Sequence, residues 1–352
     1  MPPKKGKNGR NSTTGSKRGV SFEKFFTSVY GARWPTLRKS MTASTPKKVV
    51  LWNRFCQLPF EKAMANMKRV DDKSLLQVFC AESDELLNSP QPQLHQIIDD
   101  FNVRAHHLID YTSALIVEQL EVTAFNKVLD MCAGSGENTI TIAQSLSVDG
   151  VLIANETKSD RYVRLQRHIR EYVPPNFVPV TITRRDAQTW YSPSTYHRVL
   201  VDVPCTCEGR IMQQHKRQWG TIPMSPQLWS EEKSRAMSTT QRTLLLRGIE
   251  ACLPGGRIVY STRSISPVEN DDVVEFVLRR KRGTVEVQKI TMTVGEATNY
   301  GWMVLPDTTG GIGPMYCCVM QKVSDTRVES EEEEDEEESD SNSDNNTDEE
   351  RN

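Results

Sequence analysis

The chain has 352 residues, of which 37% are hydrophobic, and its mean hydropathy is −0.53. This length allows one large domain with extensions, or two domains, and the apolar content is sufficient for a core. No apolar run approaches the roughly 20 residues that span a membrane, and the first stretch lacks the apolar core of a secretory signal. The composition therefore excludes a membrane-spanning protein and indicates a soluble one.

The charge is distributed unevenly. Residues 329–352 carry 14 of the 46 acidic residues and one of the 44 basic ones, whereas residues 1–20 carry six basic residues and no acidic one. Because both ends lack apolar periodicity, we predict a disordered basic arm at 1–20 and a disordered acidic tail at 325–352. The surplus of bases outside the tail fits a polyanion such as RNA, although a charge of this size is also ordinary for a body of this length.

Eight cysteines are scattered along the chain, and none forms a C-x-x-C pair. They are Cys56, Cys80, Cys132, Cys205, Cys207, Cys252, Cys317 and Cys318. This pattern predicts buried free thiols in a reducing compartment, with neither a disulfide framework nor a metal site.

Residues 21–120 are predicted to form a mostly helical extension. An amphipathic element is expected around Trp52, Phe55, Leu58 and Phe60. A break is expected at Pro90–Gln93, and a helix at Leu108–Leu120 should lead into the next domain.

From Lys127 onward, strand and helix patterns alternate. Strands are predicted at 128–134, 151–156, 179–186, 198–204, 257–262, 284–293 and 315–323. Helices are predicted at 138–147, 160–172, 229–253 and 269–281, the third ending at Pro254-Gly255-Gly256. Alternating units of this kind predict an α/β fold whose mostly parallel sheet has helices on both faces.

A glycine-rich turn, Asp130–Gly136, separates the first of these strands from its helix. Glycines let the backbone approach a ligand, and the helix N-terminus offers free N–H groups. Glu156, at the end of the next strand, suits ribose hydroxyls, and Asp186, at the end of the third, suits an adenine amino group. With Asp202 at the end of the fourth strand, the four acids predict a nucleoside ligand at one edge of the sheet, although any one of them alone could be a solvated acid.

Two β-branched runs end abruptly in small and polar residues, as buried parallel strands do when they supply a site. VLVDVPCTCEG (199–209) delivers Asp202, Pro204 and Cys205, and PGGRIVYSTRS (254–264) delivers Thr262, Arg263 and Ser264.

These strand ends resemble the RNA cytosine-5 methyltransferases of the Nop/Sun (NSUN) family, which carry D-x-P-C after one strand and T-C-S after the next. The first motif is complete at 202–205, but Arg263 stands where the second has its nucleophilic cysteine. The resemblance is strongest to the mitochondrial ribosomal-RNA branch and extends over Phe22–Lys322. It is supported by FFTSVYGARWPTLRKSM (25–41), SPVENDDVVEFVL (266–278) and GIGPMYCCVMQK (311–322).

The resemblance implies a class I S-adenosylmethionine-dependent methyltransferase domain, Rossmann-like, at 121–324, with an RNA- or partner-binding extension at 21–120. The residues expected to bind the cofactor are Cys132, Ala133, Gly134, Gly136, Glu156, Asp186 and Asp202. The family's turn reads C-A-A-P-G-G-K-T, whereas this chain has Ser135, Glu137 and Asn138 in place of Pro, the second Gly and Lys. Because a cation is lost and an acid gained beside the methionine carboxylate, we expect weakened binding.

The family's chemistry places two cysteines on the target base. The T-C-S cysteine adds to carbon 6, which makes carbon 5 nucleophilic, and the P-C cysteine assists release. By position Cys205 is the releasing thiol, whereas Arg263 cannot attack because its guanidinium stays protonated. Arg263 could instead hold a phosphate or a base edge. Two rescues remain open: attack by Cys205 itself, or by Cys207 on the same loop, which is otherwise a small loop residue.

Two functions therefore compete. One is an inactive relative that binds RNA and S-adenosylmethionine and serves ribosome biogenesis with a protein partner, and Arg263 favours it. The other is an active ribosomal-RNA cytosine-5 methyltransferase that uses Cys205 or Cys207, and a weaker third is methyl transfer without a covalent step. The resembled branch indicates mitochondria, while the charged ends also suit the nucleus or nucleolus. RNA contacts are expected at Lys216, Arg217, Arg279, Arg280, Lys281 and Arg282.

Overall fold

The computed structural model describes residues 21–43, 47–63, 67–71, 74, 76–81, 97–220 and 227–325. The predicted basic arm, the acidic stretch after Asp325 and the break at 90–93 lie outside these residues.

The alternation predicted from Lys127 onward builds a nine-stranded sheet. Its strands are β5 (Lys127–Asp130), β6 (Val151–Asn155), β7 (Val180–Thr183), β8 (Tyr196–Asp202), β9 (Cys252–Thr262), β10 (Val285–Gln288), β11 (Glu296–Ala297), β12 (Trp302–Val304) and β13 (Met315–Lys322). They follow the order β11-β12-β13-β9-β8-β5-β6-β7, and β10 also pairs with β13. Strands β7, β6, β5, β8 and β9 are parallel, whereas β13 runs antiparallel to β9. The predicted mostly parallel α/β sheet is thus confirmed.

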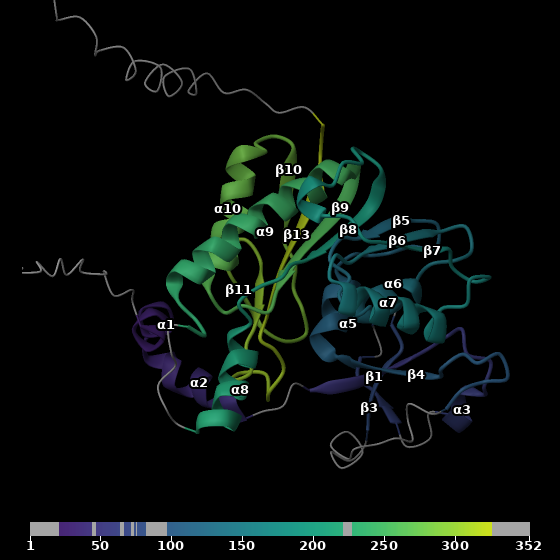
Figure 1. The fold of residues 1–352 in the computed structure, drawn as a ribbon, viewed down its shortest axis with the longest axis horizontal. Coiled ribbons are helices and arrows are strands. Elements are labelled where there is room, and N and C mark those ends of the chain that lie inside the picture. The colour runs from purple at the N-terminus through teal and green to yellow at the C-terminus, as the bar shows by residue number, and fades with distance from the viewer. Residues whose placement is uncertain are drawn as a thin grey trace, which may run out of the picture.

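Helices cover both faces of this sheet, as Figure 1 shows. They are α5 (Tyr111–Glu118), α6 (Glu137–Ala143), α7 (Ser159–Tyr172), α9 (Glu231–Ala251) and α10 (Asp271–Arg280), and a further helix, α8 (Glu208–Trp219), follows the end of β8. Helix α8 and the short strands β11 and β12 were not predicted. The residues Pro254-Gly255-Gly256, expected as a helix stop, follow the end of α9 and lie within β9.

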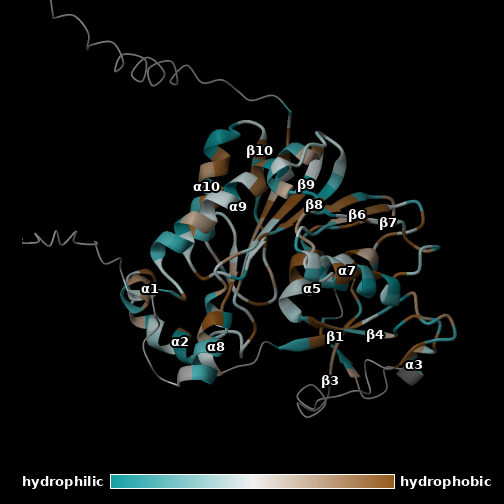
Figure 2. Cartoon of the chain, viewed as in Figure 1, coloured by the Kyte–Doolittle hydropathy of each residue, from teal (hydrophilic) through white to brown (hydrophobic). Residues whose placement is uncertain are grey.

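Alternating side chains of the strands fill two separate cores. In β8, Val199 and Val201 pack with α9 and α10, whereas Leu200 between them packs with α5, α6 and α7. The same alternation separates Val259 from Tyr260 in β9. Because successive side chains of a strand point to opposite faces, a continuous apolar run is what a sheet covered on both sides requires. The strands are accordingly the most hydrophobic part of the cartoon in Figure 2.

The N-terminal extension is only partly helical, which corrects the prediction. After α1 (Phe22–Tyr30) and α2 (Trp34–Ala43), it forms a four-stranded antiparallel sheet in the order β2-β3-β1-β4, and its described residues also include a short helix, α3 (Phe60–Ala63). The strands are β1 (Lys48–Trp52), β2 (Met67–Arg69), β3 (Val78–Ala81) and β4 (His106–Asp110). The amphipathic element expected at 52–60 is instead the end of β1 and a turn. The helix expected at 108–120 begins three residues later, as α5, because β4 occupies its start.

The two parts of the extension contact different regions of the larger domain. The aromatic rings of Phe22 and Phe26 pack on Trp229, and the Tyr30 hydroxyl donates to the Ile265 carbonyl at 2.7 Å. The small sheet contacts α7 instead, through Asn53 Nδ2, which donates to the carbonyl of Tyr172 at 2.8 Å. Figure 1 shows α1 and α2 beside α8, and β1 and β4 below α5. The two parts therefore stand on either side of the loops that follow β8 and β9.

Within the described ranges, no helix has the length and apolar composition needed to cross a membrane.

Candidate functional site

Four strand ends bring their acidic residues to one edge of the sheet. β8, β5, β6 and β7 are neighbours and run parallel, so their carboxyl ends share an edge. Asp130 and Asp202 are the last residues of β5 and β8, and Glu156 follows β6 directly. Asp186 lies three residues beyond β7, is exposed, and caps a short turn by accepting from Gln188 N at 3.0 Å. The predicted edge is therefore present, with Asp186 at its outer end.

The glycine-rich turn after β5 has the conformation that its sequence predicts. Gly134 and Gly136 adopt φ of +58° and +98°, which disfavours any residue with a side chain. A Cβ at Gly136 would also lie 2.9 Å from Leu165 Cδ1 in α7. The turn is tied to the sheet by Ala133 N–H, which donates to the Asn155 carbonyl at 2.9 Å. The backbone angle thus favours glycine at 136, and a Cβ there would also displace the Leu165 side chain of α7.

Two buried polar atoms beside this turn have no hydrogen-bond partner: Asp130 Oδ1 and Asn138 Oδ1. The second oxygen of Asp130 accepts from Thr139 Oγ1 at 2.6 Å, and Asn138 Nδ2 donates to Asp202 Oδ2 at 2.8 Å. Buried polar groups are nearly always paired in folded proteins, so unpaired ones at a strand edge point to a polar ligand. With the open glycine turn, they fit S-adenosylmethionine, whose amino-acid end carries both donors and acceptors.

Burial raises the pKa of two groups at this edge. Burial, and then the negative charges of Asp202 and Glu156, raise the pKa of Asp130 to about 7, against the hydrogen bond from Thr139. Burial, and then the charge of Asp130, also raise the pKa of the Cys132 thiol. Cys132 is therefore neutral and serves as part of the turn, not as a nucleophile.

The loop between β8 and α8 carries the two cysteines of interest. Cys205 Sγ and Cys207 Sγ lie 3.1 Å apart, and the backbone N–H of Arg263 donates to Cys205 Sγ at 3.2 Å. The thiol–thiol hydrogen bond and then burial raise the pKa of Cys205. The same hydrogen bond lowers the pKa of Cys207, against burial, and the cations Arg210 and Arg263 lower it further. Of the two thiols, Cys207 is therefore the one that ionises more readily, and it stands at the N-cap of α8 with φ of +53°.

The side chain of Arg263 extends away from these thiols, towards the start of α5. Its guanidinium forms an ion pair with Asp110 Oδ2 at 3.3 Å, donates to Ser113 Oγ at 3.1 Å, and contacts Thr112 Oγ1. These partners lie at the junction of β4 and α5, some 150 residues earlier in the chain. Burial disfavours the charge, but Asp110, Asp202 and Glu137 hold the pKa of Arg263 above its ordinary value. The side chain is thus a fixed cation, with 26% of its surface exposed.

A buried carboxyl pair, which sequence reasoning missed, joins the loops after β8 and β9. The Thr206 hydroxyl contacts both Glu208 Oε1 and Glu269 Oε1, and Glu208 Oε2 accepts from Ile265 N at 3.0 Å. Burial, and then the charge of Glu269, raise the pKa of Glu208 to about 7. Trp229 Nε1 also donates to Glu208 Oε1 at 2.9 Å, and Gln241 Nε2 donates to Glu269 Oε2 at 2.9 Å, so several buried donors hold the two carboxyl groups. Glu269 lies within the resembling segment 266–278, but nothing in its local pattern distinguishes it from a solvated helix-start acid.

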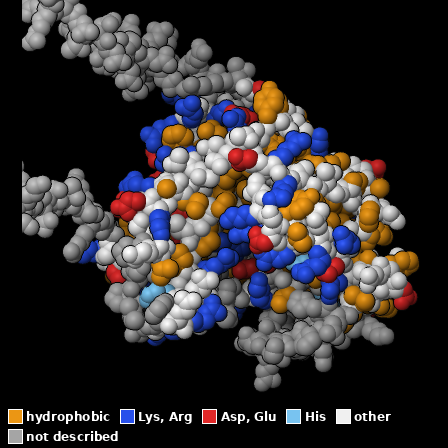
Figure 3. Space-filling view, in the orientation of Figure 1, with side chains coloured by type: hydrophobic (Ala, Val, Ile, Leu, Met, Phe, Trp, Pro, Cys, Tyr) orange, Lys and Arg blue, Asp and Glu red, His pale blue; other side chains and the backbone are white. Residues whose placement is uncertain are grey.

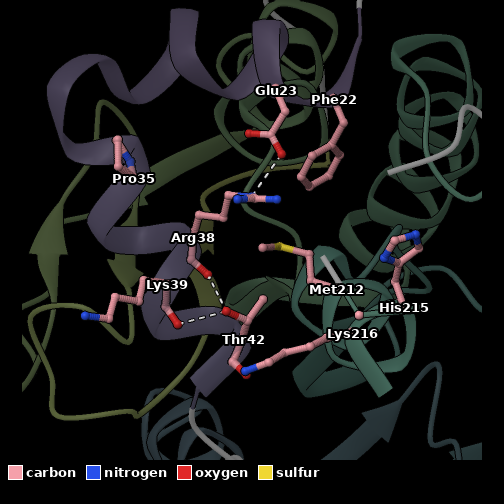
Figure 4. A pocket seen from close by; sticks show the side chains of 10 residues that line it. Phe22, Glu23, Pro35, Arg38, Lys39, Thr42, Met212, His215 and Lys216 are labelled. Carbon is pink, nitrogen blue, oxygen red and sulfur yellow. Dashed lines mark hydrogen bonds and ion pairs between the residues drawn. The ribbon is translucent and has the colours of Figure 1, made fainter. Parts of the chain in front are cut away.

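The predicted RNA contacts separate into two regions. Lys216 lines a pocket of about 290 Å³ between α2 and α8, with Arg38, Lys39 and the nearly buried His215 (Figure 4). Lys216 Nζ donates to the Thr42 carbonyl at 3.2 Å. The other predicted group, Arg279 to Arg282, lies at the end of α10, away from α8 in Figure 1. The structure therefore groups only the α8 part of the predicted contacts with the site.

Figure 3 shows Lys and Arg side chains gathered, with a few acidic ones, across the middle of the face between α8 and α5.

All eight cysteines are free, and Cys56, Cys252, Cys317 and Cys318 are buried. In the part of the chain that the structure describes, no group of three or more His, Cys, Asp or Glu side chains is placed to hold a metal ion.

Comparison with known proteins identifies one matching family and several similar relatives. Residues 117–320 match the profile of the family described as 16S rRNA methyltransferase RsmB/F. The chain is 31% identical over 244 residues to "5-cytosine rRNA methyltransferase NSUN4" of Xenopus tropicalis, covering 64% of this chain and 58% of that protein. It is 30% identical over 237 residues to "tRNA (cytosine(34)-C(5))-methyltransferase, mitochondrial" of Danio rerio, covering 63% and 62%. The match thus spans about three fifths of these relatives.

The fold is also that of solved methyltransferases. The crystal structure of NSun6 from Pyrococcus horikoshii with SFG superposes with a TM-score of 0.66 over 86% of this chain and 97% of that one, at 16% identity. The predicted class I S-adenosylmethionine-dependent methyltransferase fold, with helices in its N-terminal region, is therefore confirmed.

Proposed function

Because the chain belongs to the 16S rRNA methyltransferase RsmB/F family, we propose that it binds S-adenosylmethionine and ribosomal RNA and serves ribosome biogenesis without forming the cysteine–base adduct of cytosine-5 methylation. The observation that carries this proposal is Arg263 beside Cys205. Its backbone N–H lies 3.2 Å from Cys205 Sγ, and its guanidinium is fixed on Asp110 and Ser113.

Cofactor binding is supported by the edge of β5. Gly134 and Gly136 keep the turn open, and the unpaired oxygens of Asp130 and Asn138 are available to a polar ligand. Glu156 stands at the end of the neighbouring strand, where it suits ribose hydroxyls. When bound, S-adenosylmethionine supplies an electrophilic methyl group. The residues of this chain bind and orient it.

The covalent step is what this chain lacks. Methylation of carbon 5 requires a thiolate that adds to carbon 6 of the cytosine ring. After methyl transfer a proton acceptor removes the carbon-5 proton, and the thiolate leaves. An arginine at 263 cannot supply an electron pair at neutral pH. The arginine side chain instead extends to Asp110 and Ser113 at the start of α5. The inactive alternative is therefore preferred.

Binding of RNA is supported by charge. Arg38, Lys39 and Lys216 line the pocket between α2 and α8, and α8 begins at Cys207 of the cysteine loop. A strand of RNA whose nucleotide reaches that loop would place its phosphates near these cations, since nine residues of helix span roughly 14 Å. Outside residues 329–352 the chain has 43 basic and 32 acidic residues, which favours a polyanion.

The relatives support ribosomal RNA and mitochondria. The family description and the NSUN4 proteins of Xenopus name ribosomal RNA, and the Danio rerio relative is named mitochondrial. We therefore assign this chain to mitochondrial ribosome biogenesis, with RNA as partner and a second protein of the assembling particle as a further one. A nuclear or nucleolar site is the alternative that the charged ends of the chain support.

The second candidate is an active cytosine-5 methyltransferase in which Cys207 attacks. It is favoured by the 3.1 Å distance between Cys205 Sγ and Cys207 Sγ, and by the lowered pKa of Cys207. A thiolate at 207, with Cys205 as its hydrogen-bond donor, would be a usable nucleophile.

Trapping with 5-azacytidine-substituted ribosomal RNA in the presence of S-adenosylmethionine separates the two. The ring nitrogen at position 5 carries no proton to remove after methylation, so an attacking thiol stays bound to the RNA. We expect no adduct from the wild type on a denaturing gel, and an adduct from Arg263→Cys. A wild-type adduct that disappears in Cys207→Ala or Cys205→Ala would overturn the proposal in favour of the active enzyme.

A further inference from the structure

The cofactor edge of this chain has an unusual balance of charge. The glycine turn carries Glu137 and Asn138 where the resembled family has Gly and Lys. Asn138 donates to Asp202, so the position of the family's cation is now neutral and bonded to an acid. Asp130 and Glu156 complete a set of carboxyl groups at the same edge. A ligand that brings one more carboxylate would meet strong repulsion unless a cation lies nearby.

Arg263 is placed to be that cation. Its backbone lies two residues beyond Ser261, which pairs with Asp202 across β8 and β9. Its guanidinium reaches Asp110 and Ser113 at the start of α5, the helix that packs against α6. Helix α6 begins at Glu137 of the glycine turn, and the charge of Glu137 acts on the Arg263 guanidinium, so this cation lies at the same edge as the turn.

The electrostatics agree with this placement. The charges that act most strongly on the Arg263 guanidinium belong to Asp110, Asp202 and Glu137, one at the start of α5, one at the end of β8 and one in the turn. Asp110 is already its ion-pair partner, at 3.3 Å. A guanidinium has five N–H donors, so it can keep that partner and still bind a second carboxylate.

We propose that Arg263 is the cation of the cofactor site in this chain: it replaces the lysine missing from the glycine turn and binds the carboxylate of the methionine end of S-adenosylmethionine. On this proposal, Arg263 supplies the positive charge that the glycine turn lacks at Asn138, so the residues at these two positions are coupled. This inference rests on the proposed function, because it requires that the cofactor is bound. It gives Arg263 a binding role, beyond the loss of a thiol.

Isothermal titration calorimetry with two probes tests it. S-adenosylhomocysteine carries the carboxylate and the amine, whereas its decarboxylated derivative keeps only the amine. We expect the wild type to prefer the first probe, and Arg263→Met to lose at least tenfold in affinity for that probe while its affinity for the second is unchanged. Arg263→Lys should retain part of the preference, because the charge is kept but the bidentate geometry is lost.

A rescue makes the test specific. In the double variant Arg263→Met/Asn138→Lys, the turn regains its cation and the preference for S-adenosylhomocysteine should return. Arg279→Met, an exposed arginine on α10, is the matched control and should change neither affinity. Thermal unfolding of each variant shows whether it has folded, and Arg263→Lys keeps the test open if the methionine variant has not.

The outcomes separate this inference from the proposed function. If the wild type binds neither probe at millimolar concentration, cofactor binding fails, and this inference fails with it. If the wild type binds S-adenosylhomocysteine and Arg263→Met binds it equally well, the proposed function stands and Arg263 has no part in cofactor binding.

Discussion

Replacing Asp130 by asparagine should make the protein less sensitive to rising pH. Asp130 is fully buried, and only its Oδ2 has a hydrogen-bond partner, the hydroxyl of Thr139. Burial and the charges of Asp202 and Glu156 raise its pKa from 3.8 to about 7. The folded state therefore holds this proton over a range in which the unfolded chain has already lost it.

The magnitude follows from the shift. The free energy of unfolding falls as pH rises through a window in which the folded state binds more protons than the unfolded state. For Asp130 this window runs from about pH 4 to about pH 7. A difference of about 3 pKa units corresponds to about 4 kcal/mol at about 1.4 kcal/mol per unit. Asp130→Asn is neutral throughout, so its stability relative to the wild type should rise by up to this amount across the window and be constant outside it.

Urea denaturation of the ligand-free protein at pH 4, 5, 6, 7 and 8 measures this difference. Glu208, whose pKa is raised from 4.5 to about 7, contributes a fall in the same direction, but it is present in both proteins and cancels. Asp149→Asn, at an exposed loop position, is the control and should run parallel to the wild type. If Asp130→Asn also runs parallel to the wild type from pH 4 to 8, the Asp130 carboxyl is already ionised at pH 5 and the account of this edge is wrong.

Three further outcomes are expected. Glu156→Ala should weaken binding of S-adenosylmethionine by about 1–3 kcal/mol in calorimetry, the cost of an unmade hydrogen bond to a charged group; unchanged affinity would place the ribose elsewhere. Affinity for ribosomal RNA should fall steeply with salt and rise when residues 329–352 are deleted, and Lys216→Glu should weaken binding and flatten the salt dependence in filter binding; a flat profile in the wild type would contradict the electrostatic argument. Thr206→Val should lower the free energy of unfolding by about 1–3 kcal/mol, because two buried carboxyl groups lose their shared hydroxyl; a smaller loss than for Thr239→Val, on the exposed side of α9, would contradict that role.

The local sequence by itself determined the larger domain. Apolar runs of strand length alternate with helical patterns, and parallel strands place their carboxyl ends together, so the grouping of Asp130, Glu156 and Asp202 could be predicted without coordinates. The open turn at Gly134 and Gly136 could be predicted for the same reason, since only the backbone conformation of those residues is at issue. Arg263 between Thr262 and Ser264, on which the proposal of an inactive protein rests, is likewise visible in the sequence alone.

The extension could not be predicted in this way. Its antiparallel sheet joins β1, β3 and β4, whose pairing depends on contacts between residues as far apart as Lys48 and Asp110. Short apolar runs such as KVVLW are compatible with a strand or with a buried helix, and only the partner strand decides between them. Pairing with β1 likewise explains why a strand, β4, occupies the start of the helix predicted at 108–120.

Only the tertiary structure decided which side chains contact one another in the site. Arg263 is held by Asp110 and Ser113, which lie about 150 residues away, and Glu208 meets Glu269 through one hydroxyl of Thr206. Local periodicity determines which face a side chain takes, but not which distant loop lies opposite that face. Such contacts arise when the chain closes on itself, and together with burial they raise the pKa of Glu208 and hold that of Arg263 above its ordinary value.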